Sequence, residues 1–383
     1  MPRFDVIVVG AGPAGSTAAR ELAGSGVRVL VLDRARFPRY KACGGGIPQR
    51  TERMLPFPID SVVENSVSHL EVAYRGGMRF RRDSGAPFAH MVMRDRFDDL
   101  LLSYAKAAGA EFRPQTTVRA LEQNDDGVRV IADGFEAEAS YLVCADGAHS
   151  PTGKMAGLGD GIAECAAWEV EVSAPAATLR RYRETALIEL GYRPWGYAWL
   201  FPKANNLSIG VVVPPGQAGR MKDYVRAYLQ RLGLESAPTE IARGHKVRFR
   251  RGAESIAGHR ALLAGDAAGL ADEFTEEGIG YAVHSGRLAA RNVLRALRDG
   301  AGLGGYERDI DAEIMPELRA ARLIGHMFYG MLGRAPRPWM FAAAHFPPLW
   351  DAFFAVQRGE STYAREVARV PVLPALAARM LHD

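Results

Sequence analysis

Four short apolar runs divide the chain and predict buried strands, because each is short and ends at a glycine or an aspartate. The runs are residues 4–9, 27–32, 141–145 and 261–264. Other segments alternate loosely or carry β-branched and aromatic residues, which is typical of antiparallel strands; they are residues 66–93 and 163–214. Amphipathic patterns predict helices over residues 94–109, 221–232, 280–297 and 312–331. The pattern therefore predicts a mixed α/β (α+β) chain.

We predict a Rossmann-like nucleotide-binding domain that is interrupted by an antiparallel-sheet domain and followed by C-terminal helices. The first domain comprises residues 1–65, 94–162 and 252–300, and the inserted, substrate-binding domain comprises residues 66–93 and 163–251. Residues 301–383 form the helical region. Its aromatic stretch, residues 339–356, is expected to pack onto the core; capping a tunnel or docking on a membrane is the alternative.

The first apolar run leads directly into a glycine turn with the spacing of a dinucleotide-binding fingerprint, Gly10-Ala-Gly-Pro-Ala-Gly15. Gly10 permits the tight turn, Gly12 lets the backbone approach a pyrophosphate, and Gly15 lets the helix pack closely on the sheet. Small residues such as Ala14 follow, and the second run closes at Asp33, which is placed to accept hydrogen bonds from a ribose. The sequence predicts a dinucleotide site here; an ordinary glycine-rich turn is the alternative.

Composition narrows the class of protein. The 383 residues are 48% hydrophobic and 24% charged with a net charge of +4, as in an ordinary globular chain. No apolar run is long enough to span a bilayer and no leader is recognisable, so we expect a cytoplasmic protein, with peripheral contact at the inner membrane face as an option. The three cysteines lack metal-ligand spacing, so no metal is expected. The basic clusters come with no nucleic-acid motif, and we expect no nucleic-acid partner.

Residues 34–50 are basic and aromatic and contain three adjacent glycines, Gly44 to Gly46, directly after Cys43. Such a loop is expected where backbone lies close against a flat or bulky ligand. A flexible surface loop is the alternative from this segment alone.

Three separated motifs together resemble the flavoprotein family built on the p-hydroxybenzoate hydroxylase fold. They are the glycine turn, Asp146-Gly-Ala-His-Ser150 after one strand, and Gly265-Asp266-Ala-Ala after another. The resemblance implies that the dinucleotide is FAD, that Asp266 binds its ribityl side, and that Asp146 supports the cofactor at the domain junction.

Within that family the chain resembles the geranylgeranyl reductase branch. Lys41-Ala-Cys-Gly-Gly-Gly46 matches one hallmark, Pro194-Trp-Gly-Tyr-Ala-Trp-Leu-Phe-Pro202 matches another, and Arg94-Asp-Arg-Phe-Asp98 matches the helix start whose arginine lies along FAD. With the glycine turn, the expected cofactor-binding residues are Gly10, Gly12, Ala14, Gly15, Asp33, Arg34, Cys43, Gly44, Gly45, Arg94, Asp146, Gly265, Asp266, Gly278 and Ile279.

One segment departs from the family pattern. After Gly-Asp-Ala-Ala the family usually has Asn-Pro-Phe-Thr-Gly-Glu-Gly-Ile, whereas residues 272–279 read Asp-Glu-Phe-Thr-Glu-Glu-Gly-Ile. Glu273 thus replaces a proline and Glu276 a glycine, beside the expected place of the isoalloxazine. These extra carboxylates are expected to lower the flavin potential, supply a proton or indicate a different substrate.

The resemblance implies an FAD-dependent oxidoreductase that reduces C=C bonds of a polyprenyl chain, by hydride transfer from reduced flavin N5 and protonation of the other carbon. Cys43 and Glu277 are the candidate catalytic residues. The strand carrying Tyr197, Trp199, Phe201 and Pro202 is expected to wall an apolar pocket, with a sheet core as the alternative.

Two other functions are compatible with these motifs. A flavin monooxygenase or halogenase acting on a hydrophobic or aromatic substrate would consume oxygen with NAD(P)H. A non-catalytic, flavin-bound protein that carries lipid or binds a partner would show no turnover. The expected partners are an isoprenoid or other apolar small molecule and an electron donor, which is NAD(P)H, ferredoxin or quinol.

Overall fold

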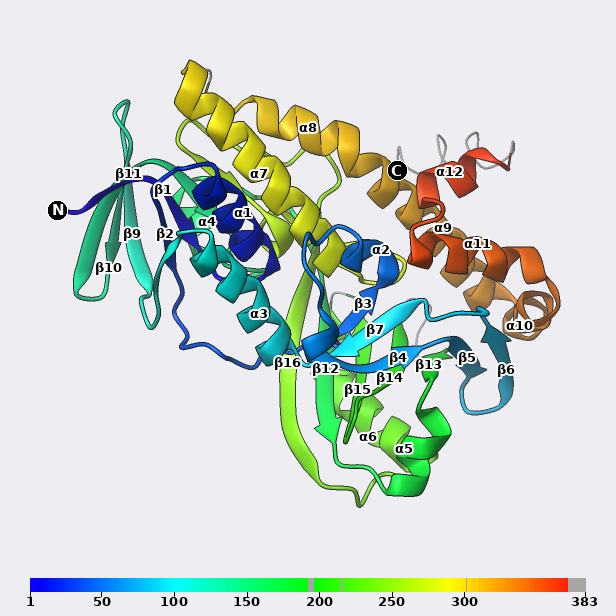
Figure 1. The fold of residues 1–383 in the computed structure, drawn as a ribbon. Helices are drawn as coiled ribbons and strands as arrows, with labels where there is room; N and C mark the ends of the chain where they lie inside the picture. The colour runs from blue at the N-terminus through cyan, green and yellow to red at the C-terminus, as the bar shows by residue number, and fades with distance from the viewer. Residues whose placement is uncertain (192–195, 215, 301, 371–383) are drawn as a thin grey trace.

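The computed structural model describes residues 1–191, 196–214, 216–300 and 302–370, and its first sheet contains the predicted buried strands (Figure 1). The strand order is β8 (Glu111–Arg113), β2 (Val29–Leu32), β1 (Arg3–Val9), β11 (Phe135–Cys144), β10 (Val128–Ala132) and β9 (Val118–Gln123), with β17 (Ala261–Leu263) also paired to β11. β1, β2, β8, β11 and β17 pair in parallel, so their carboxyl ends meet at one edge.

Helices α1 (Pro13–Gly24), α3 (Arg94–Ala107) and α7 (Ile279–Asp299) pack beside this sheet, where α1 contacts both α3 and α7 (Figure 1). The approach of α1 to α7 is close at Gly286, where an added Cβ would lie 2.4 Å from the Ala14 carbonyl oxygen. Small residues on both helices thus permit the contact that brings the N-termini of α1 and α7 to the same edge.

The second sheet is larger and lies below the first in Figure 1. Its order is β16 (Thr239–Phe249), β12 (Ala163–Val172), β15 (Leu207–Val213), β14 (Tyr197–Pro202), β13 (Thr185–Leu190), β5 (His69–Tyr74) and β6 (Met78–Asp83). All neighbours pair antiparallel except β13 and β5, which are parallel. Helices α5 (Ala176–Tyr182), η2 (Ala218–Arg220) and α6 (Met221–Leu232) accompany it.

A separate three-stranded sheet joins β3 (Gly46–Pro48), β7 (Ala89–Val92) and β4 (Val63–Val67), near α2 (Gln49–Glu52) and η1 (Asp60–Val62). The segment 66–93, expected to belong wholly to the inserted sheet, is therefore divided: β5 and β6 join the large sheet, whereas β7 pairs with β3 and β4. The alternation of hydrophobic and polar residues predicts a strand but not the strand with which it pairs. For this reason the sequence did not predict that β7 joins a different sheet. The predicted fold class is confirmed, and the exact domain boundaries stay a prediction.

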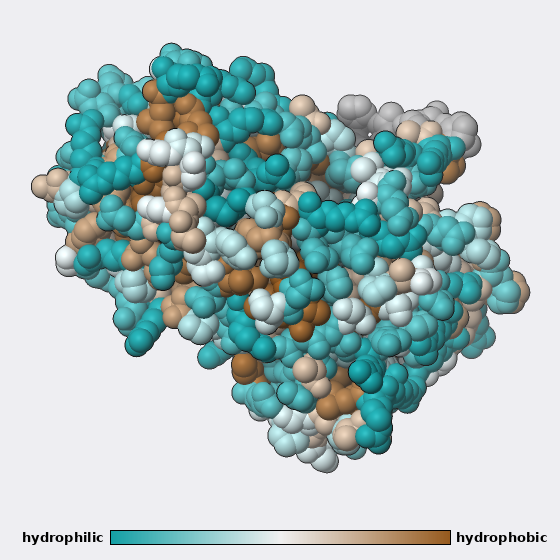
Figure 2. All heavy atoms as spheres, in the orientation of Figure 1, coloured by the Kyte–Doolittle hydropathy of each residue, from teal (hydrophilic) through white to brown (hydrophobic). Residues whose placement is uncertain are grey.

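The described part of the C-terminal region consists mainly of helices, the last of which ends at Ala368 (Figure 1). The remaining helices are α4 (Pro151–Met155), η3 (Gly265–Ala268), α8 (Gly305–Glu313), α9 (Met315–Arg334), α10 (Pro336–His345), α11 (Pro347–Arg358) and α12 (Tyr363–Ala368). Aromatic residues of α11 pack on the large and small sheets: Trp350 contacts Phe80, and Phe354 contacts Phe88. The face of the molecule in Figure 2 is mostly hydrophilic, with small scattered apolar patches.

Candidate active site

The glycine turn between β1 and α1 has the close packing that its spacing predicts. Gly10 has a φ of 101°, and an added Cβ would lie 2.2 Å from the Ala145 carbonyl oxygen at the end of β11. A Cβ on Gly15 would lie 1.8 Å from the Gly10 carbonyl oxygen. A Cβ on Gly12 would meet only the Arg39 guanidinium, at 3.8 Å. Gly10 and Gly15 therefore close the turn, while Gly12 leaves space at the N-terminus of α1 for an anionic group.

Asp33 ends β2 beside this turn, but its carboxylate has backbone partners. Oδ2 accepts a hydrogen bond from the Ala11 amide at 2.8 Å, and Oδ1 accepts one from the Ala35 amide at 2.8 Å. The side chain is 8% exposed. Asp33 therefore holds the glycine turn against the β2 end, and its contact with a ribose stays a prediction. Arg34, also expected at the cofactor, lines a cavity at this edge of the sheet.

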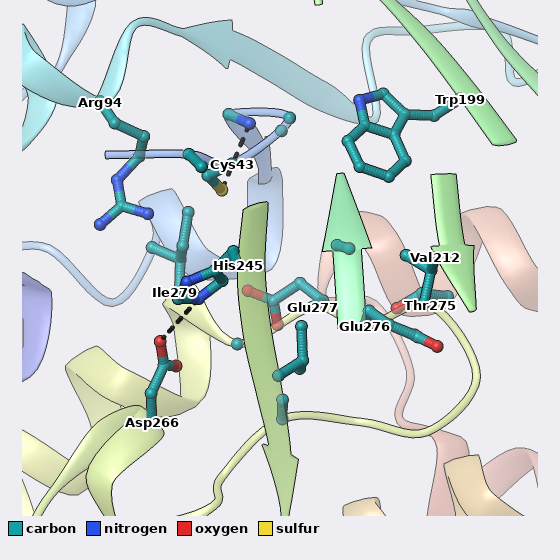
Figure 3. A pocket seen from close by; sticks show the side chains of 18 of the residues that line it. Cys43, Arg94, Trp199, Val212, His245, Asp266, Thr275, Glu276, Glu277 and Ile279 are labelled. Atoms are coloured by element: carbon teal, nitrogen blue, oxygen red, sulfur yellow. Dashed lines mark hydrogen bonds and ion pairs between the residues drawn. The ribbon is translucent and has the colours of Figure 1, made fainter. Parts of the chain in front are cut away.

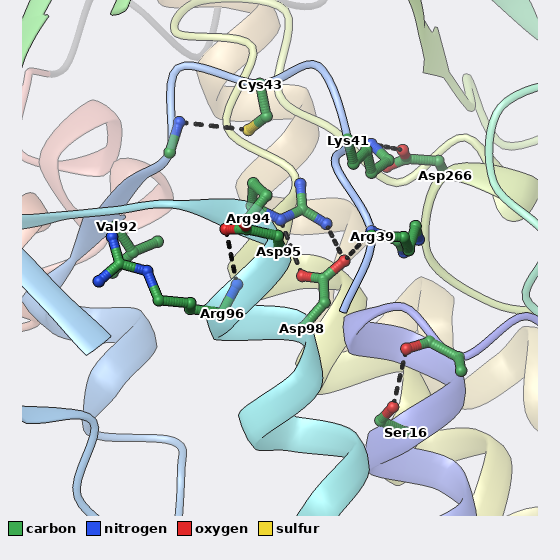
Figure 4. A network of polar contacts seen from close by, with 12 residues as sticks. Ser16, Arg39, Lys41, Cys43, Val92, Arg94, Asp95, Arg96, Asp98 and Asp266 are labelled. Atoms are coloured by element: carbon green, nitrogen blue, oxygen red, sulfur yellow. Dashed lines mark hydrogen bonds and ion pairs between the residues drawn. The ribbon is translucent and has the colours of Figure 1, made fainter. Parts of the chain in front are cut away.

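Asp266 on η3 lies in a compact charged cluster with Lys41 and His245, from three distant segments (Figures 3 and 4). Its Oδ2 lies 3.4 Å from Lys41 Nζ and 3.5 Å from His245 Nε2, and these two nitrogens are 3.2 Å apart. Burial opposes ionisation of Asp266, but Lys41 and then His245 hold its pKa below the ordinary value. Burial and the Lys41 charge lower the pKa of His245 to about 4. The cluster keeps a carboxylate at the predicted ribityl position.

The neutral state of His245 predicts an acid-sensitive fold. The pKa of His245 falls from 6.5 to about 4 on folding. Between these two pH values the unfolded chain therefore binds a proton at His245 that the folded protein does not bind. We expect the free energy of unfolding of the apoprotein to be greatest above pH 6.5 and to decrease as the pH falls toward 4. In urea titrations at a series of pH values, the free energy of unfolding of His245→Gln should lack this part of the pH dependence. The same substitution at the exposed His259 should retain it. An unchanged slope in His245→Gln would contradict the assignment.

Asp146 follows β11 and faces the same edge. Its Oδ2 accepts hydrogen bonds from the Thr152 amide at 2.9 Å and from the Thr152 hydroxyl at 2.7 Å. Its buried Oδ1 has no partner within the described part of the chain. An anchored carboxylate with one spare buried oxygen is suited to accept a hydrogen bond from a bound cofactor, as the sequence predicts for this residue.

Arg94 begins α3 and supports the loop that carries Cys43 (Figure 4). Its Nε and Nη2 donate to the two carboxylate oxygens of Asp98 at 2.8 and 2.9 Å, and Arg39 Nη1 lies 2.8 Å from Asp98 Oδ2. Although burial would raise the pKa of Asp98, the two guanidinium groups lower it. The bidentate pair fixes Arg94 at the cavity wall.

The Cys43–Gly46 loop lies directly against the strand motif that the sequence singled out. A Cβ on Gly44 would be 2.8 Å from the Phe201 ring and 3.1 Å from Trp199 Nε1. Gly45 has a φ of 68°, and its amide donates to Cys43 Sγ at 3.4 Å. The structure thus brings together two motifs that are about 150 residues apart in the sequence.

A buried polar network that was not predicted from the sequence supports the Cys43–Gly46 loop. Glu169 on β12 accepts hydrogen bonds from the Cys43 amide at 2.5 Å, from Tyr40 Oη at 3.1 Å and from Ser208 Oγ at 2.8 Å. Lys203, after β14, donates to the Gly44 carbonyl at 2.6 Å and to the Val92 carbonyl at 2.9 Å. The only feature of the sequence that pointed to this network is the repeated glutamate in the otherwise apolar run Trp168-Glu-Val-Glu-Val.

A cavity of about 570 Å³ is bordered by the glycine turn, Arg94, Asp266 and the Cys43–Gly46 loop (Figure 3). One side contains the glycine turn, Cys43, Arg94 and Asp266, and the other is apolar. The apolar wall includes Leu70, Val72, Phe88, Met91, Ile188, Tyr197, Trp199, Phe201, Val212, Phe328, Trp350 and Phe353.

Not every predicted residue of the strand motif borders the cavity. Tyr197, Trp199 and Phe201 do, but Pro202 does not, because alternate residues of a strand project to opposite faces. Pro194 lies outside the described residues.

Residues 272–278 form a tightly bonded loop at the junction of the two sides. Asp272 Oδ1 accepts from the Phe274 and Thr275 amides at 2.9 and 2.6 Å, and the Glu276 amide donates to the Asp272 carbonyl at 3.1 Å. Tyr197 Oη donates to the Thr275 carbonyl at 2.5 Å. The loop ends at Gly278, before the N-terminus of α7 at Ile279, so backbone amides face the cavity.

Glu277, a predicted proton source, is held by two partners. Oε1 accepts from the Gly280 amide at 2.7 Å and Oε2 lies 3.3 Å from Arg50 Nη2. Burial raises the pKa of Glu277, although Arg50 acts in the opposite direction. These contacts cap α7, so they favour a positioning role, and proton donation by Glu277 stays a prediction.

Comparison with known proteins agrees with this geometry. The family model for an FAD binding domain matches residues 3–303. A geranylgeranyl diphosphate reductase from Rhodobacter capsulatus is 31% identical over 309 residues, which are 78% of this chain and 77% of that protein. The chain belongs to the geranylgeranyl reductase family of FAD-dependent oxidoreductases. This flavoprotein is thus an FAD-dependent enzyme, which confirms the cofactor predicted from the motifs.

Solved structures share its fold. A geranylgeranyl bacteriochlorophyll reductase-like protein from Thermoplasma acidophilum superposes with a TM-score of 0.78 at 22% identity, covering 95% of this chain and 93% of that one. A flavin-dependent brominase superposes with a TM-score of 0.76 at 18% identity, covering 99% and 100%. At these identities both similarities establish the fold alone. In the described part of this flavoprotein, no helix has both the length and the apolar character needed to cross a bilayer.

Proposed function

We propose that this flavoprotein reduces C=C bonds of an isoprenoid chain. The observation that carries the proposal is a cavity whose apolar wall begins where the Cys43–Gly46 loop meets Trp199 and Phe201. An apolar chain placed along that wall would have its double bond beside the predicted flavin side, and the packed aromatic rings would exclude water from it. The homology to a geranylgeranyl diphosphate reductase supports the same substrate class.

The cofactor site is proposed from how the residues fit FAD. The N-terminus of α1, with the space above Gly12, would hold the diphosphate; Asp33 and Arg34 would lie at the ribose, Asp146 and Asp266 at the ribityl side, and the amides of Gly278 and Ile279 at the flavin ring. When bound in its reduced form, FAD supplies a hydride. Cys43 and Arg94 would orient the substrate face of the ring, and Gly44 and Gly45 would allow its close approach.

Mass spectrometry tests the substrate class directly. The FAD-loaded protein is reduced with dithionite and incubated without oxygen with geranylgeranyl diphosphate or a polyprenyl quinone. We expect a gain of two mass units for each double bond reduced. Val212→Ala should lower this yield while retaining bound FAD, because it shortens a side chain of the apolar wall. No mass gain with any isoprenoid would contradict the proposal.

The electron donor is proposed to be NAD(P)H, ferredoxin or quinol. Stopped-flow reduction of the bound flavin by each donor under anaerobic conditions identifies it. The same experiment in air separates the reductase from a monooxygenase or halogenase, since only the latter couples oxygen consumption to a change in the substrate. Turnover of the isoprenoid without oxygen is the expected result.

We also propose that α9 to α11 contact a membrane surface from which an isoprenoid is drawn. Phe341 and Phe346 are 63% and 58% exposed, and Met331 is 45% exposed, close in sequence to the cavity residues Phe328 and Trp350. In sedimentation with vesicles of phosphatidylglycerol and phosphatidylcholine, Phe341→Ser/Phe346→Ser should bind several-fold less than the wild type. The exposed Met155→Ser on α4 serves as a control, and equal binding of all three would contradict this contact.

A further inference from the structure

Glu276 occupies a backbone conformation that ordinarily favours glycine. Its φ is 56°, in the left-handed region, where a side chain is strained. The surrounding loop enforces this conformation: the Glu276 amide donates to the Asp272 carbonyl, and Tyr197 and Tyr329 donate to the Thr275 and Phe274 carbonyls at 2.5 and 3.0 Å. Strain that the surroundings maintain is typical of functional positions, and the side chain that it displays here is a carboxyl.

The Glu276 carboxyl lies at the apolar side of the cavity. Figure 3 places it beside Thr275 and Val212, on the side of Trp199 and away from Cys43, Arg94 and Asp266. Its Oε2 is shielded from solvent and accepts no hydrogen bond from the described residues. Burial, followed by the nearby Asp272 and Glu273 carboxylates, raises the pKa of Glu276 well above the ordinary value. Burial and the neighbouring carboxylates therefore favour the protonated form of this carboxyl.

Of the other candidate proton donors, Glu277, Tyr197 and Tyr329 have hydrogen-bond partners, and Cys43 lies on the opposite side of the cavity (Figure 3). Glu277 binds Arg50 and the Gly280 amide, and the Tyr197 and Tyr329 hydroxyls donate to backbone carbonyls. Cys43 Sγ accepts from the Gly45 amide on the opposite side. A protonated carboxyl without a competing acceptor is the better donor, because no existing bond has to be broken before it acts.

We propose that Glu276 is the general acid of the reduction. This inference rests on the proposed function. The alkene π electrons form a new C–H bond with the Glu276 proton, and the neighbouring carbon receives the hydride that reduced FAD supplies. The product thus gains two hydrogens, FAD ends oxidised, and the Glu276 carboxylate regains its proton from solvent.

The test compares FAD-loaded wild type, Glu276→Gln and a surface control, Glu164→Gln, whose side chain is 45% exposed on β12. Glutamine keeps the shape and a hydrogen-bond donor but cannot deliver a proton. After dithionite reduction, we expect geranylgeranyl diphosphate to reoxidise the flavin of Glu276→Gln roughly 100-fold more slowly than that of the wild type. FAD affinity should be unchanged, and Glu164→Gln should match the wild type.

Two further measurements do not depend on turnover. The infrared difference spectrum between the wild type and Glu276→Gln should contain the carbonyl band of a protonated carboxyl at pH 7. Glu276→Gly should unfold at a higher temperature than the wild type, because glycine releases the backbone strain. Equal reoxidation rates in the wild type and Glu276→Gln, or a carboxylate band in place of the carbonyl band, would overturn the inference. A wild type that reduces no isoprenoid would refute the proposed function. A wild type that reduces an isoprenoid as fast as Glu276→Gln does would refute only the role of Glu276.

Discussion

Replacing Gly15 with alanine is expected to give a protein that retains no FAD. The added Cβ would lie 1.8 Å from the Gly10 carbonyl oxygen and 3.2 Å from the Ala145 Cβ. A backbone oxygen cannot move aside as a flexible side chain can, so α1 would have to shift away from the turn that β1 and β11 define. Overpacking of this kind costs about 3 kcal/mol or more, and it displaces the amides proposed to face the diphosphate. Flavin absorbance per mole of purified protein measures the loss.

Gly24→Ala is the matched control for this substitution. Gly24 ends the same helix, and a Cβ there would meet nothing within 4 Å. Alanine is the better helix former, so Gly24→Ala is expected to bind FAD fully and to be as stable as the wild type or slightly more stable, by up to about 1 kcal/mol. If Gly15→Ala also remained yellow and stable, the close packing of the turn would be refuted.

The sequence was sufficient to predict that the proposed nucleotide-binding residues lie together, because these residues follow parallel strands. Gly10 follows β1, Asp33 follows β2, Asp146 follows β11 and Gly265 follows β17, and the carboxyl ends of parallel strands meet at one edge. A motif that follows one of these strands is therefore predicted to lie at this edge. The contact of Gly44 with Phe201 was not predicted, since nothing local relates two segments so far apart.

Other features depend on contacts that local pattern does not encode. His245 lies on β16, and its neighbours Lys41 and Asp266 come from a loop and from η3. Lys203 looks like an ordinary polar residue after a strand, yet it is 3% exposed. In both cases the decisive property is burial next to another domain segment, which requires the tertiary structure. Glu276 is intermediate: the departure from the family pattern was visible, but its strained backbone was not.

The network below the Cys43–Gly46 loop links the large sheet to the proposed flavin side. Glu169 is 2% and Glu171 1% exposed, and Glu171 Oε2 accepts from Asn206 Nδ2 at 2.7 Å. Burial lowers the pKa of Lys203, while the Glu171 and Glu169 carboxylates act in the opposite direction. Burial in turn raises the pKa of Glu171 to about 8, although Lys203 acts against this shift. Lys203 thus interacts with both acids and also holds the Gly44 and Val92 carbonyls.

Lys203→Met is expected to lower the free energy of unfolding by about 3–5 kcal/mol and to weaken FAD binding. Methionine has a similar length, so packing is largely kept, but two buried carbonyl oxygens lose their donor and the acidic groups lose their counter-charge. Breaking one partner of a buried charged network costs about that amount. Urea unfolding gives the change in stability, and titration of the apoprotein with FAD gives the change in affinity.

Lys246→Met is the control, because Lys246 forms an exposed pair with Glu164 on the same sheet, where the expected loss is at most about 1 kcal/mol. In Lys203→Met/Glu169→Gln, the second substitution removes a carboxylate that has lost its balancing charge, so the combined loss should be smaller than the sum of the single losses. Strict additivity would mean that Glu169 and Lys203 act independently. In that case the loop would be held by separate hydrogen bonds, and FAD affinity would respond to each residue alone.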